Sequence, residues 1–270
     1  MILNNHTMQV KLNFTEVQNF DTKELSIYKS LRENAFSADN SFIADSPKVV
    51  NKLLEGAVEV KSILATSEYY EEFEELLLPK KVPTLYLATK EMMQNIVGHK
   101  IHHNVMMHAI RPKENTLETL GEQIIMLDEI TSTQNIGSIA RSAAALGVDS
   151  YVVPKQGPHP YARRAMRVSM GYTGKLKIHT YDDIITTIQT LQTLGYRVFA
   201  AEVTEDATML SQVEVPQKWI LLMGHEGKGI SQDILNVCDE VVSIEMQEGV
   251  KSFNVAVAAS IMMYQFKNRV

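Results

Sequence analysis

The chain has 270 residues, with 26 lysines and arginines against 32 aspartates and glutamates, and therefore a formal net charge of −6. A composition of 45% hydrophobic and 21% charged residues is that of a globular protein and excludes disordered and fibrous classes. No stretch approaches the roughly 18 uninterrupted apolar residues of a membrane helix, and the N-terminus lacks a signal-peptide pattern. The single cysteine, Cys238, excludes an internal disulfide, so we expect a cytoplasmic protein without membrane contact. Taken by itself, the acidic balance argues against a nucleic-acid partner.

The first 110 residues alternate between short apolar strands and short helices. Strands are expected at 41–44, 58–65, 82–88 and 104–110, and helices at 23–32, 47–56, 68–78 and 90–97. Pro47 near the first helical position and Ser67 as a cap mark two of the helix starts. This alternation predicts an α/β layer structure with parallel strand pairing.

Two groups of titratable residues in this half have both a functional and a structural interpretation. The glutamates at 68, 71, 72, 74 and 75 form either an acidic site or a solvated helix face, and the lack of interleaved ligands favours the face. His99, His102 and His103 have no cysteine and no regular spacing beside a carboxylate. A loop cluster is therefore favoured over a zinc site, and no metal is expected.

A polar segment that contains a proline separates two apolar-patterned regions. Residues 111–121 read RPKENTLETLG. The expected organisation is a smaller N-terminal α/β domain at 1–111, a linker at 112–121 and a second α/β domain at 122–270.

In the second region, residues typical of turns and helix ends separate the expected elements more clearly. Strands are expected at 124–130, 151–153, 197–201, 219–223 and 241–244, and helices at 136–146, 161–170, 180–194 and 252–266. The strand 219–223 has no internal polar residue, which predicts a strand covered on both faces. The helix 252–266 is apolar nearly all round, which predicts burial in a core or at a subunit interface.

The first of three unusual loops spans residues 133–141, where a strand passes into a helix. Asn135 is expected to cap the helix, and Gly137 to permit close approach to the first-turn N–H groups. Arg141 would then lie near the positive end of the helix dipole, which disfavours a cation and indicates a role. The structural alternative is an exposed arginine that covers an apolar neighbour.

The other two loops follow later strands. Three glycines at 224, 227 and 229 indicate tight backbone geometry beside a ligand at a strand's carboxyl end, although a plain turn with Glu226 exposed is the alternative. The spacing matches neither the Walker nor the Gly-x-Gly-x-x-Gly pattern, which disfavours ATP or NAD. In the third loop, 244–255, Ser252 is expected to cap the last helix and Asn254 to lie in its first turn, facing inward.

Together the three loops resemble the signature motifs of the SpoU (TrmH-like) RNA methyltransferases of the SPOUT superfamily. The matching residues are Asn135, Gly137 and Arg141; Gly224, Glu226 and Gly229; Ile244, Met246, Ser252, Phe253, Asn254 and Val255; and, between the first two groups, Arg167, Ser169 and Gly171. The resemblance is strong over 121–270. Over 40–110 it is loose and implies a substrate-binding domain similar to RNA-binding ribosomal proteins. It further implies a trefoil knot around a parallel sheet, an obligate homodimer, and S-adenosylmethionine held in the knot.

The resemblance also implies roles for the motif residues. Gly224, Ile244, Met246 and Phe253 would line the cofactor site, and Arg141 would be catalytic, with Asn135, Glu226, Ser252 and Asn254 placing it, the substrate or the cofactor. The implied reaction is methylation of a ribose 2′-hydroxyl in rRNA or tRNA. Because the pKa of arginine stays above about 12, we favour a role in orienting phosphate and stabilising an alkoxide over that of a literal base.

The motifs depart from the family pattern at three places. Ser132-Thr133 stands for Asp-Pro and Glu245 for Pro, which affects loop stiffness, and Phe253 stands for Leu, which alters the shape of the adenine pocket. No polar motif residue is lost. An active enzyme is therefore favoured over a catalytically silent RNA-binding protein that keeps the fold, and methylation of a base nitrogen stays open as the alternative target.

Positive charge is concentrated in one segment. Residues 155–179 contain six lysines and arginines and no acidic residue, so the rest of the chain carries −12. The segment falls between two of the motifs. We therefore predict that Arg163, Arg164 and Arg167 contact RNA phosphates, the alternative being a basic surface helix.

Overall fold

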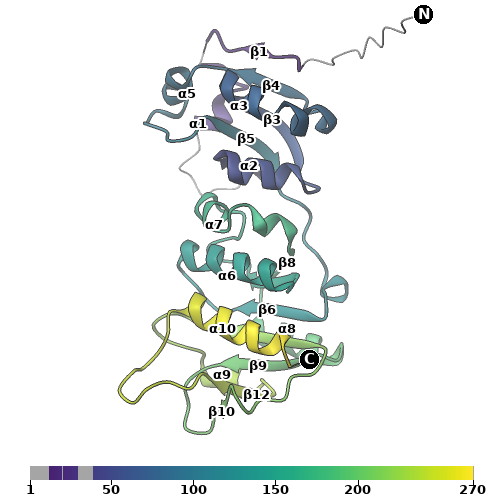
Figure 1. The fold of residues 1–270 in the computed structure, drawn as a ribbon. Coiled ribbons are helices and arrows are strands. Elements are labelled where there is room, and N and C mark those ends of the chain that lie inside the picture. The colour runs from purple at the N-terminus through teal and green to yellow at the C-terminus, as the bar shows by residue number, and fades with distance from the viewer. Residues whose placement is uncertain (1–11, 20, 30–38, 270) are drawn as a thin grey trace, which may run out of the picture. The chain divides into compact units, whose positions relative to one another are not determined.

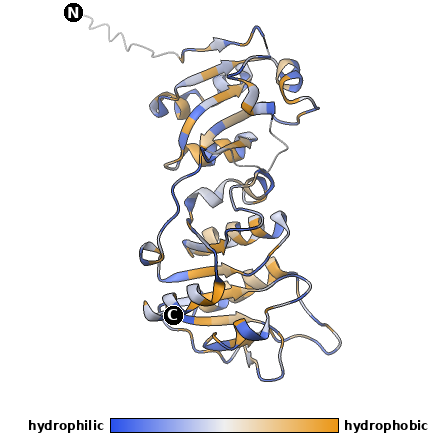
Figure 2. Ribbon diagram, turned by 180° about the vertical axis from the view of Figure 1, so that it is seen from behind, coloured by the Kyte–Doolittle hydropathy of each residue, from blue (hydrophilic) through white to orange (hydrophobic). Residues whose placement is uncertain are grey.

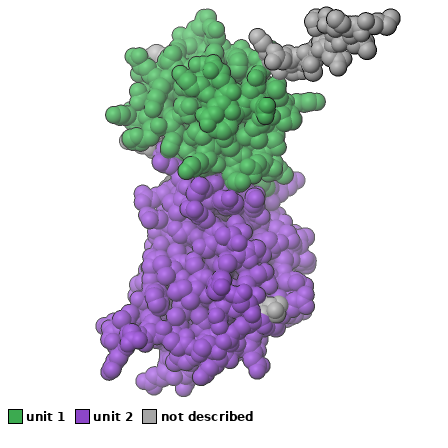
Figure 3. Space-filling view, viewed as in Figure 1, with its two compact units in different colours: residues 1–112 green, residues 113–270 purple. Residues whose placement is uncertain are grey.

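The computed structural model describes residues 12–19, 21–29 and 39–269, and the chain divides into two compact units, Met1–Pro112 and Lys113–Val270. Figure 3 colours the two units separately. Figure 2 shows that apolar residues gather on the strands inside each unit. In the described residues, no helix is both long enough and apolar enough to cross a membrane.

Unit 1 is built on a five-stranded sheet with the order β1-β4-β3-β5-β2 (Figure 1). The strands are β1 (Thr15–Glu16), β2 (Ser41–Asp45), β3 (Glu59–Ala65), β4 (Thr84–Leu87) and β5 (Val105–Ile110). The helices are α1 (Ser26–Lys29), α2 (Pro47–Leu54), α3 (Ser67–Glu72), α4 (Glu74–Leu77) and α5 (Lys90–Val97), and a 3₁₀ turn spans Leu78–Lys80. The part of the expected helix 23–32 beyond residue 29 lies outside the described residues.

The expected parallel pairing is found in only part of the sheet of unit 1. Strands β1, β3 and β4 are parallel, but β5 runs antiparallel to both β3 and β2. The segment that follows α5 returns to the start of α5, since Lys90 Nζ donates to the His102 carbonyl at 3.4 Å. Helix α5 starts near the carboxyl ends of β3 and β4. The chain therefore enters β5 from that end of the sheet, and β5 runs antiparallel to β3.

The acidic segment is a solvated face, as expected, but it is not one helix. All five glutamates are exposed, whereas Tyr69 and Tyr70 on the same helix are buried. The helix breaks at Phe73, whose φ of −118° leaves the helical region. Thr66 rather than Ser67 is the residue that precedes the first helical turn. His99, His102 and His103 lie in the loop after α5, and within the described residues no group of three or more ligands for a metal ion is found.

Unit 2 is built on a seven-stranded, fully parallel sheet with the order β10-β12-β9-β11-β6-β7-β8. The strands are β6 (Gln123–Leu127), β7 (Ser150–Pro154), β8 (Lys177–Tyr181), β9 (Arg197–Ala201), β10 (Thr208–Met209), β11 (Trp219–Met223) and β12 (Glu240–Ser243). The helices are α6 (Thr133–Leu146), α7 (Arg163–Val168), α8 (Ile184–Thr193), α9 (Gln232–Leu235) and α10 (Val255–Lys267), with 3₁₀ turns at Leu117–Thr119 and Tyr172–Lys175.

The central strand β11 is buried on both faces, which confirms the expectation from its apolar sequence. All five of its residues are at most 2% exposed. On one face Ile220 and Leu222 join the cluster that contains Ile188 of α8. On the other face Trp219 packs edge-on against Phe266 of α10, with ring centroids 5.2 Å apart.

Several elements of unit 2 differ from expectation. The last two residues of strand β8 were expected to begin a helix, but α8 begins only at Ile184, where Asp183 accepts a hydrogen bond from the Thr186 N–H at 2.7 Å. The short elements β10 and α9 were not expected. Helix α7 is shorter than 161–170, because Met170 and Gly171 adopt left-handed φ values of 54° and 80°.

The division between the units falls at the start of the segment expected to be a linker. Residues beyond Pro112 are fastened to unit 2, since the Asn115 N–H donates to the Ile178 carbonyl at 2.8 Å. The Gly121 N–H likewise donates to Ser150 Oγ at 2.7 Å. This part of the segment therefore forms an edge of the second unit.

Candidate active site

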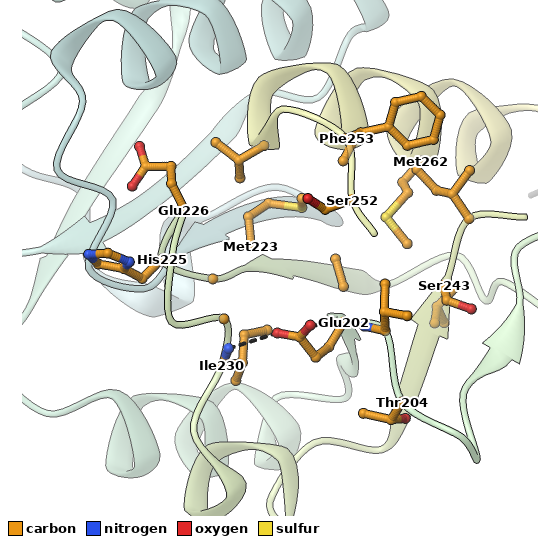
Figure 4. Close-up of a pocket in the computed structure, with 18 of the residues that line it drawn as sticks. Glu202, Thr204, Met223, His225, Glu226, Ile230, Ser243, Ser252, Phe253 and Met262 are labelled. Atoms are coloured by element: carbon orange, nitrogen blue, oxygen red, sulfur yellow. Dashed lines mark hydrogen bonds between the residues drawn. The ribbon is translucent and has the colours of Figure 1, made fainter. Parts of the chain in front are cut away.

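A pocket of about 700 Å³ opens at the carboxyl ends of the neighbouring strands β12, β9 and β11 in unit 2 (Figure 4). The start of α10 closes one side of the pocket. Its lining includes Glu202, Met223, Gly224, His225, Glu226, Ile230, Leu235, Val242, Ile244, Met246, Ser252, Phe253, Asn254 and Met262. All four residues predicted to bind the cofactor are therefore in one cavity, together with three of those assigned to catalysis.

The loop after β11 folds back tightly on itself. A Cβ atom on Gly224 would lie 2.5 Å from Ile230 Cγ1, so only glycine fits there. Gly229 has a left-handed φ of 67°, and its N–H donates to the His225 carbonyl at 3.0 Å. The glycines thus shape the loop around its own chain, and His225 and Glu226 extend from it in Figure 4.

Glu226 connects this loop to the loop after β6. Its Oε1 accepts a hydrogen bond from Asn135 Nδ2 at 3.0 Å, and its carboxylate is also within 3.4 Å of the Thr131 and Ser132 N–H groups. Partial burial alone would raise the pKa of Glu226, but the hydrogen bonds from Asn135 and the backbone outweigh it and lower that pKa. The side chain is therefore held ionised as an acceptor, and it is not a simple exposed turn residue.

Asn254 connects the same network to the third loop. Its Nδ2 donates to Asn135 Oδ1 at 3.3 Å, while its own Oδ1 accepts from the Ala256 and Val257 N–H groups at 3.0 and 3.4 Å. Asn254, and not Ser252, is thus the cap of α10, because the helix begins three residues later than expected. The structure brings Glu226, Asn135 and Asn254 from three motifs into one hydrogen-bonded chain.

Helix α6, in contrast, begins at Thr133, three residues earlier than expected. This changes the assignments of Asn135 and Arg141. Ser132 caps it by accepting from the Asn135 N–H at 3.3 Å, so Asn135 lies in the first turn with its side chain free to reach Glu226. Arg141 lies in the third turn, beyond the positive end of the dipole. Its side chain is exposed and makes no hydrogen bond or ion pair with the part of the chain that the structure describes.

The close approach at Gly137 is made by a neighbouring helix. A Cβ atom there would lie 2.5 Å from the Ala165 carbonyl oxygen of α7 and 2.9 Å from Val168 Cβ. The expected approach of a ligand to the first-turn N–H groups is therefore replaced by helix packing. Arg164 Nη2 joins the same two helices by donating to Gln134 Oε1 at 3.0 Å.

Two lysines of the basic segment are neutralised by ion pairs in the fold. Lys155 and Lys177 form ion pairs with Asp182 and Asp149, each at 3.1 Å. Arg164 and Arg167 are exposed on α7 and Arg163 is half-buried there. The three arginines predicted to contact RNA therefore lie together on one short helix.

Two carboxylate contacts near the pocket were not predicted from the sequence. Glu202, directly after β9, accepts from the Ile230 N–H at 2.9 Å and so holds the glycine loop (Figure 4). Glu202 belongs to no motif. The only sequence feature that could have indicated a role for it was its place directly after a strand. The Ser211 side chain is the main cause that lowers the pKa of Glu245, and the Ser211 N–H, which donates to the Glu245 carboxylate at 2.9 Å, lowers it further. A carboxylate thereby anchors the loop in which the family pattern has a proline.

Solved structures with the same architecture define the class of protein. An AdoMet-bound rRNA methyltransferase from Sinorhizobium meliloti has a TM-score of 0.80 at 18% identity, covering 95% of this chain and 98% of that chain. An RNA 2′-O ribose methyltransferase has a TM-score of 0.74 at 15% identity, covering 94% and 99%. The fold is that of the SPOUT methyltransferases, which confirms the expected fold class. The trefoil knot stays a prediction.

The chain belongs to the SpoU rRNA methylase family, whose model matches residues 122–264. An uncharacterized tRNA/rRNA methyltransferase of Mycobacterium bovis is 29% identical over 229 residues, which are 83% of this chain and 79% of that protein. The family expected from the three loops is thereby confirmed.

Proposed function

We propose that the protein transfers a methyl group from S-adenosylmethionine to a ribose 2′-hydroxyl of rRNA or tRNA. The observation that carries the proposal is the chain Glu226–Asn135–Asn254, which joins the three motif loops at the rim of one pocket. Membership of a methylase family supports the methyl transfer. The fold shared with an RNA 2′-O ribose methyltransferase supports the ribose hydroxyl as the acceptor.

The pocket suits the cofactor in size and chemistry. Its volume of about 700 Å³ lies within the usual range for small-molecule sites. Apolar side chains such as Met223, Leu235 and Ile244 would contact the adenine, and backbone groups around Gly224 and Met246 would bind its polar edge. When bound, the cofactor supplies a sulfonium-activated methyl group.

The chain's own task is to align the hydroxyl and to stabilise the charge that develops on it. Arg141 is assigned this role, because it is exposed on the helix that also carries Asn135. Its fixed charge would orient the adjacent phosphate and stabilise the alkoxide as the proton leaves. Asn135, Glu226 and Asn254 hold the loops beside it, and Ser252 at the pocket rim is assigned to contact substrate or cofactor.

A homodimer is part of the proposal. The face of α10 turned away from the sheet carries exposed apolar side chains, with Val257 at 47% and Tyr264 at 62% exposure, and Phe253 before the helix at 42%. Val257 and Tyr264 lie on one side of the helix, about two turns apart. A second copy that covers this stripe would remove apolar surface from water. Val257→Glu with Tyr264→Glu should yield monomers in sedimentation, whereas unchanged dimers would place the interface elsewhere.

The central test is Arg141→Ala, assayed for transfer of labelled methyl to tRNA and rRNA and for S-adenosylmethionine binding. We expect loss of transfer with binding retained. Full turnover by the variant would remove Arg141 from the mechanism. If the unmodified protein binds the cofactor but methylates neither RNA, the alternative of a catalytically silent RNA-binding protein is favoured. Digestion of the product distinguishes a ribose-methylated nucleoside from a base-methylated one.

A further inference from the structure

We propose that His225 is a positioning residue of the cofactor loop and acts only as a neutral imidazole, so that cofactor binding fails when the ring is protonated. This inference rests on the proposed function for its link to cofactor, and it assigns a role to a residue that the motif resemblance leaves without one. It concerns the hydrogen bonds of the His225 ring within the turn 225–229, which involve other atoms than the Glu226–Asn135–Asn254 chain.

The ring of His225 accepts two hydrogen bonds from the turn that follows it. The Gly227 N–H donates to Nδ1 at 2.9 Å, and the Lys228 N–H donates to the same atom at 3.2 Å. An imidazole nitrogen accepts hydrogen bonds only when it carries no proton, so the ring must be the neutral tautomer with its proton on Nε2. In the imidazolium form Nδ1 is a donor that faces two other donors.

The backbone of the same residue closes the loop. The Gly229 N–H donates to the His225 carbonyl, and the two residues pair as an isolated antiparallel bridge. His225 therefore fixes the turn 225–229 from both its ring and its backbone. Glu226 lies inside this turn, so its direction toward Asn135 depends on the turn being closed.

Groups next to the ring act in opposite directions. Asp128, directly after β6, interacts electrostatically with His225, and its own N–H donates to the Met223 carbonyl at 2.8 Å. Its negative charge attracts an imidazolium ring, whereas the two backbone N–H groups need an unprotonated Nδ1. Glu226 lies beside the ring in sequence but directs its carboxylate to the loop after β6. Asp128→Asn should therefore extend cofactor binding to lower pH.

Two substitutions of His225 distinguish the role of its hydrogen-bond acceptor from the role of its ring volume. Phenylalanine keeps the ring but has no acceptor. Asparagine places Oδ1 where it accepts from the residues two and three positions on, as in an Asx turn, and does not protonate in this range. Because both amides are exposed and can bond to water, loss of the ring acceptor costs about 0.5–1.5 kcal/mol, or about two- to tenfold in affinity.

The test is isothermal titration of the full-length protein with S-adenosylmethionine between pH 5 and 8.5, with His225→Phe, His225→Asn and Asp128→Asn alongside. We expect His225→Phe to weaken binding at every pH, and His225→Asn to restore most of that loss and to abolish the decline on the acid side. Equal affinity of His225→Phe and wild type would overturn the proposal, as would an acid decline that persists in His225→Asn.

A second readout does not depend on the cofactor or on turnover. The ¹⁵N shifts of the His225 ring in the free protein report which nitrogen carries the proton. An unprotonated Nδ1, with slow exchange of the Gly227 and Lys228 amides that is lost on acidification, is the expected result. A protonated Nδ1 at neutral pH would refute the assignment, even if the protein proved to bind no S-adenosylmethionine and the proposed function failed.

Discussion

Asn254 donates from its side-chain nitrogen to Asn135 Oδ1 across 119 residues of sequence, while its oxygen caps the helix that closes the pocket. One side chain therefore fixes both the start of α10 and the position of the loop that leads to Arg141. This relationship predicts a clear division of effects between Asn254 and its neighbour Ser252.

Asn254→Ala should lower the free energy of unfolding by about 1 kcal/mol through loss of the helix cap, and it should also weaken cofactor binding. Ser252→Ala is the matched control, because the sequence assigns the cap to Ser252 and the structure assigns it to Asn254. Thermal unfolding of both variants distinguishes the two assignments. Destabilisation by Ser252→Ala alone would favour the sequence-based one.

Gly137→Ala should destabilise unit 2 by roughly 1–3 kcal/mol, because a methyl group would overlap the Ala165 carbonyl and force α6 away from α7. Gly227→Ala is the control, since the nearest atom to an added Cβ is a His225 ring carbon at 3.7 Å. Denaturant titration should show a lower midpoint for the first variant only. Equal midpoints would mean that the two helices separate at little cost.

Glu226→Gln should make stability less dependent on pH. The pKa of Glu226 is lowered in the folded chain, so its contribution is present above the unfolded-state pKa and is lost as the pH falls through the folded-state pKa. The difference between wild type and variant should therefore be largest near neutrality and vanish in acid. Because Glu226 is exposed and screened by water, we expect less than about 1 kcal/mol, measured by thermal unfolding between pH 3 and 7.

Arg163→Ala with Arg164→Ala should flatten the salt dependence of RNA binding by about one to two units of log–log slope, if each arginine contacts one phosphate. Lys155→Ala with Lys177→Ala removes the same formal charge from the same segment, but at positions outside α7. That control should change the slope less. Equal flattening by both pairs would indicate a diffuse electrostatic effect in place of contacts at α7.

The sequence allowed the elements that follow hydrophobic periodicity to be predicted, and the loops that carry motifs to be recognised. Strand β11 and helix α5 have the predicted bounds because each is marked by an unbroken pattern and clear ends. Strand β8 was missed because its five residues merge with the next helix, and only pairing with β7 identifies them as a strand.

The residues of the site were found, but their partners were not. Helix caps depend on backbone angles that residue identity alone does not fix, so the caps were predicted at Asn135 and Ser252 but lie at Ser132 and Asn254. Glu202 was missed because its contact with Ile230 joins segments 28 residues apart and follows no local pattern. Long-range hydrogen bonds of this kind become visible only in the folded chain.

Helix α10 supplies one wall of the pocket and also the Phe266 ring that covers Trp219 and Phe199 of the central strands. During synthesis, the sheet of unit 2 therefore keeps one apolar face open until the residues of α10 have left the ribosome. A nascent chain interrupted before α10 has an incomplete core as well as an incomplete cofactor site. Such a truncated product would be a substrate for chaperones and proteases.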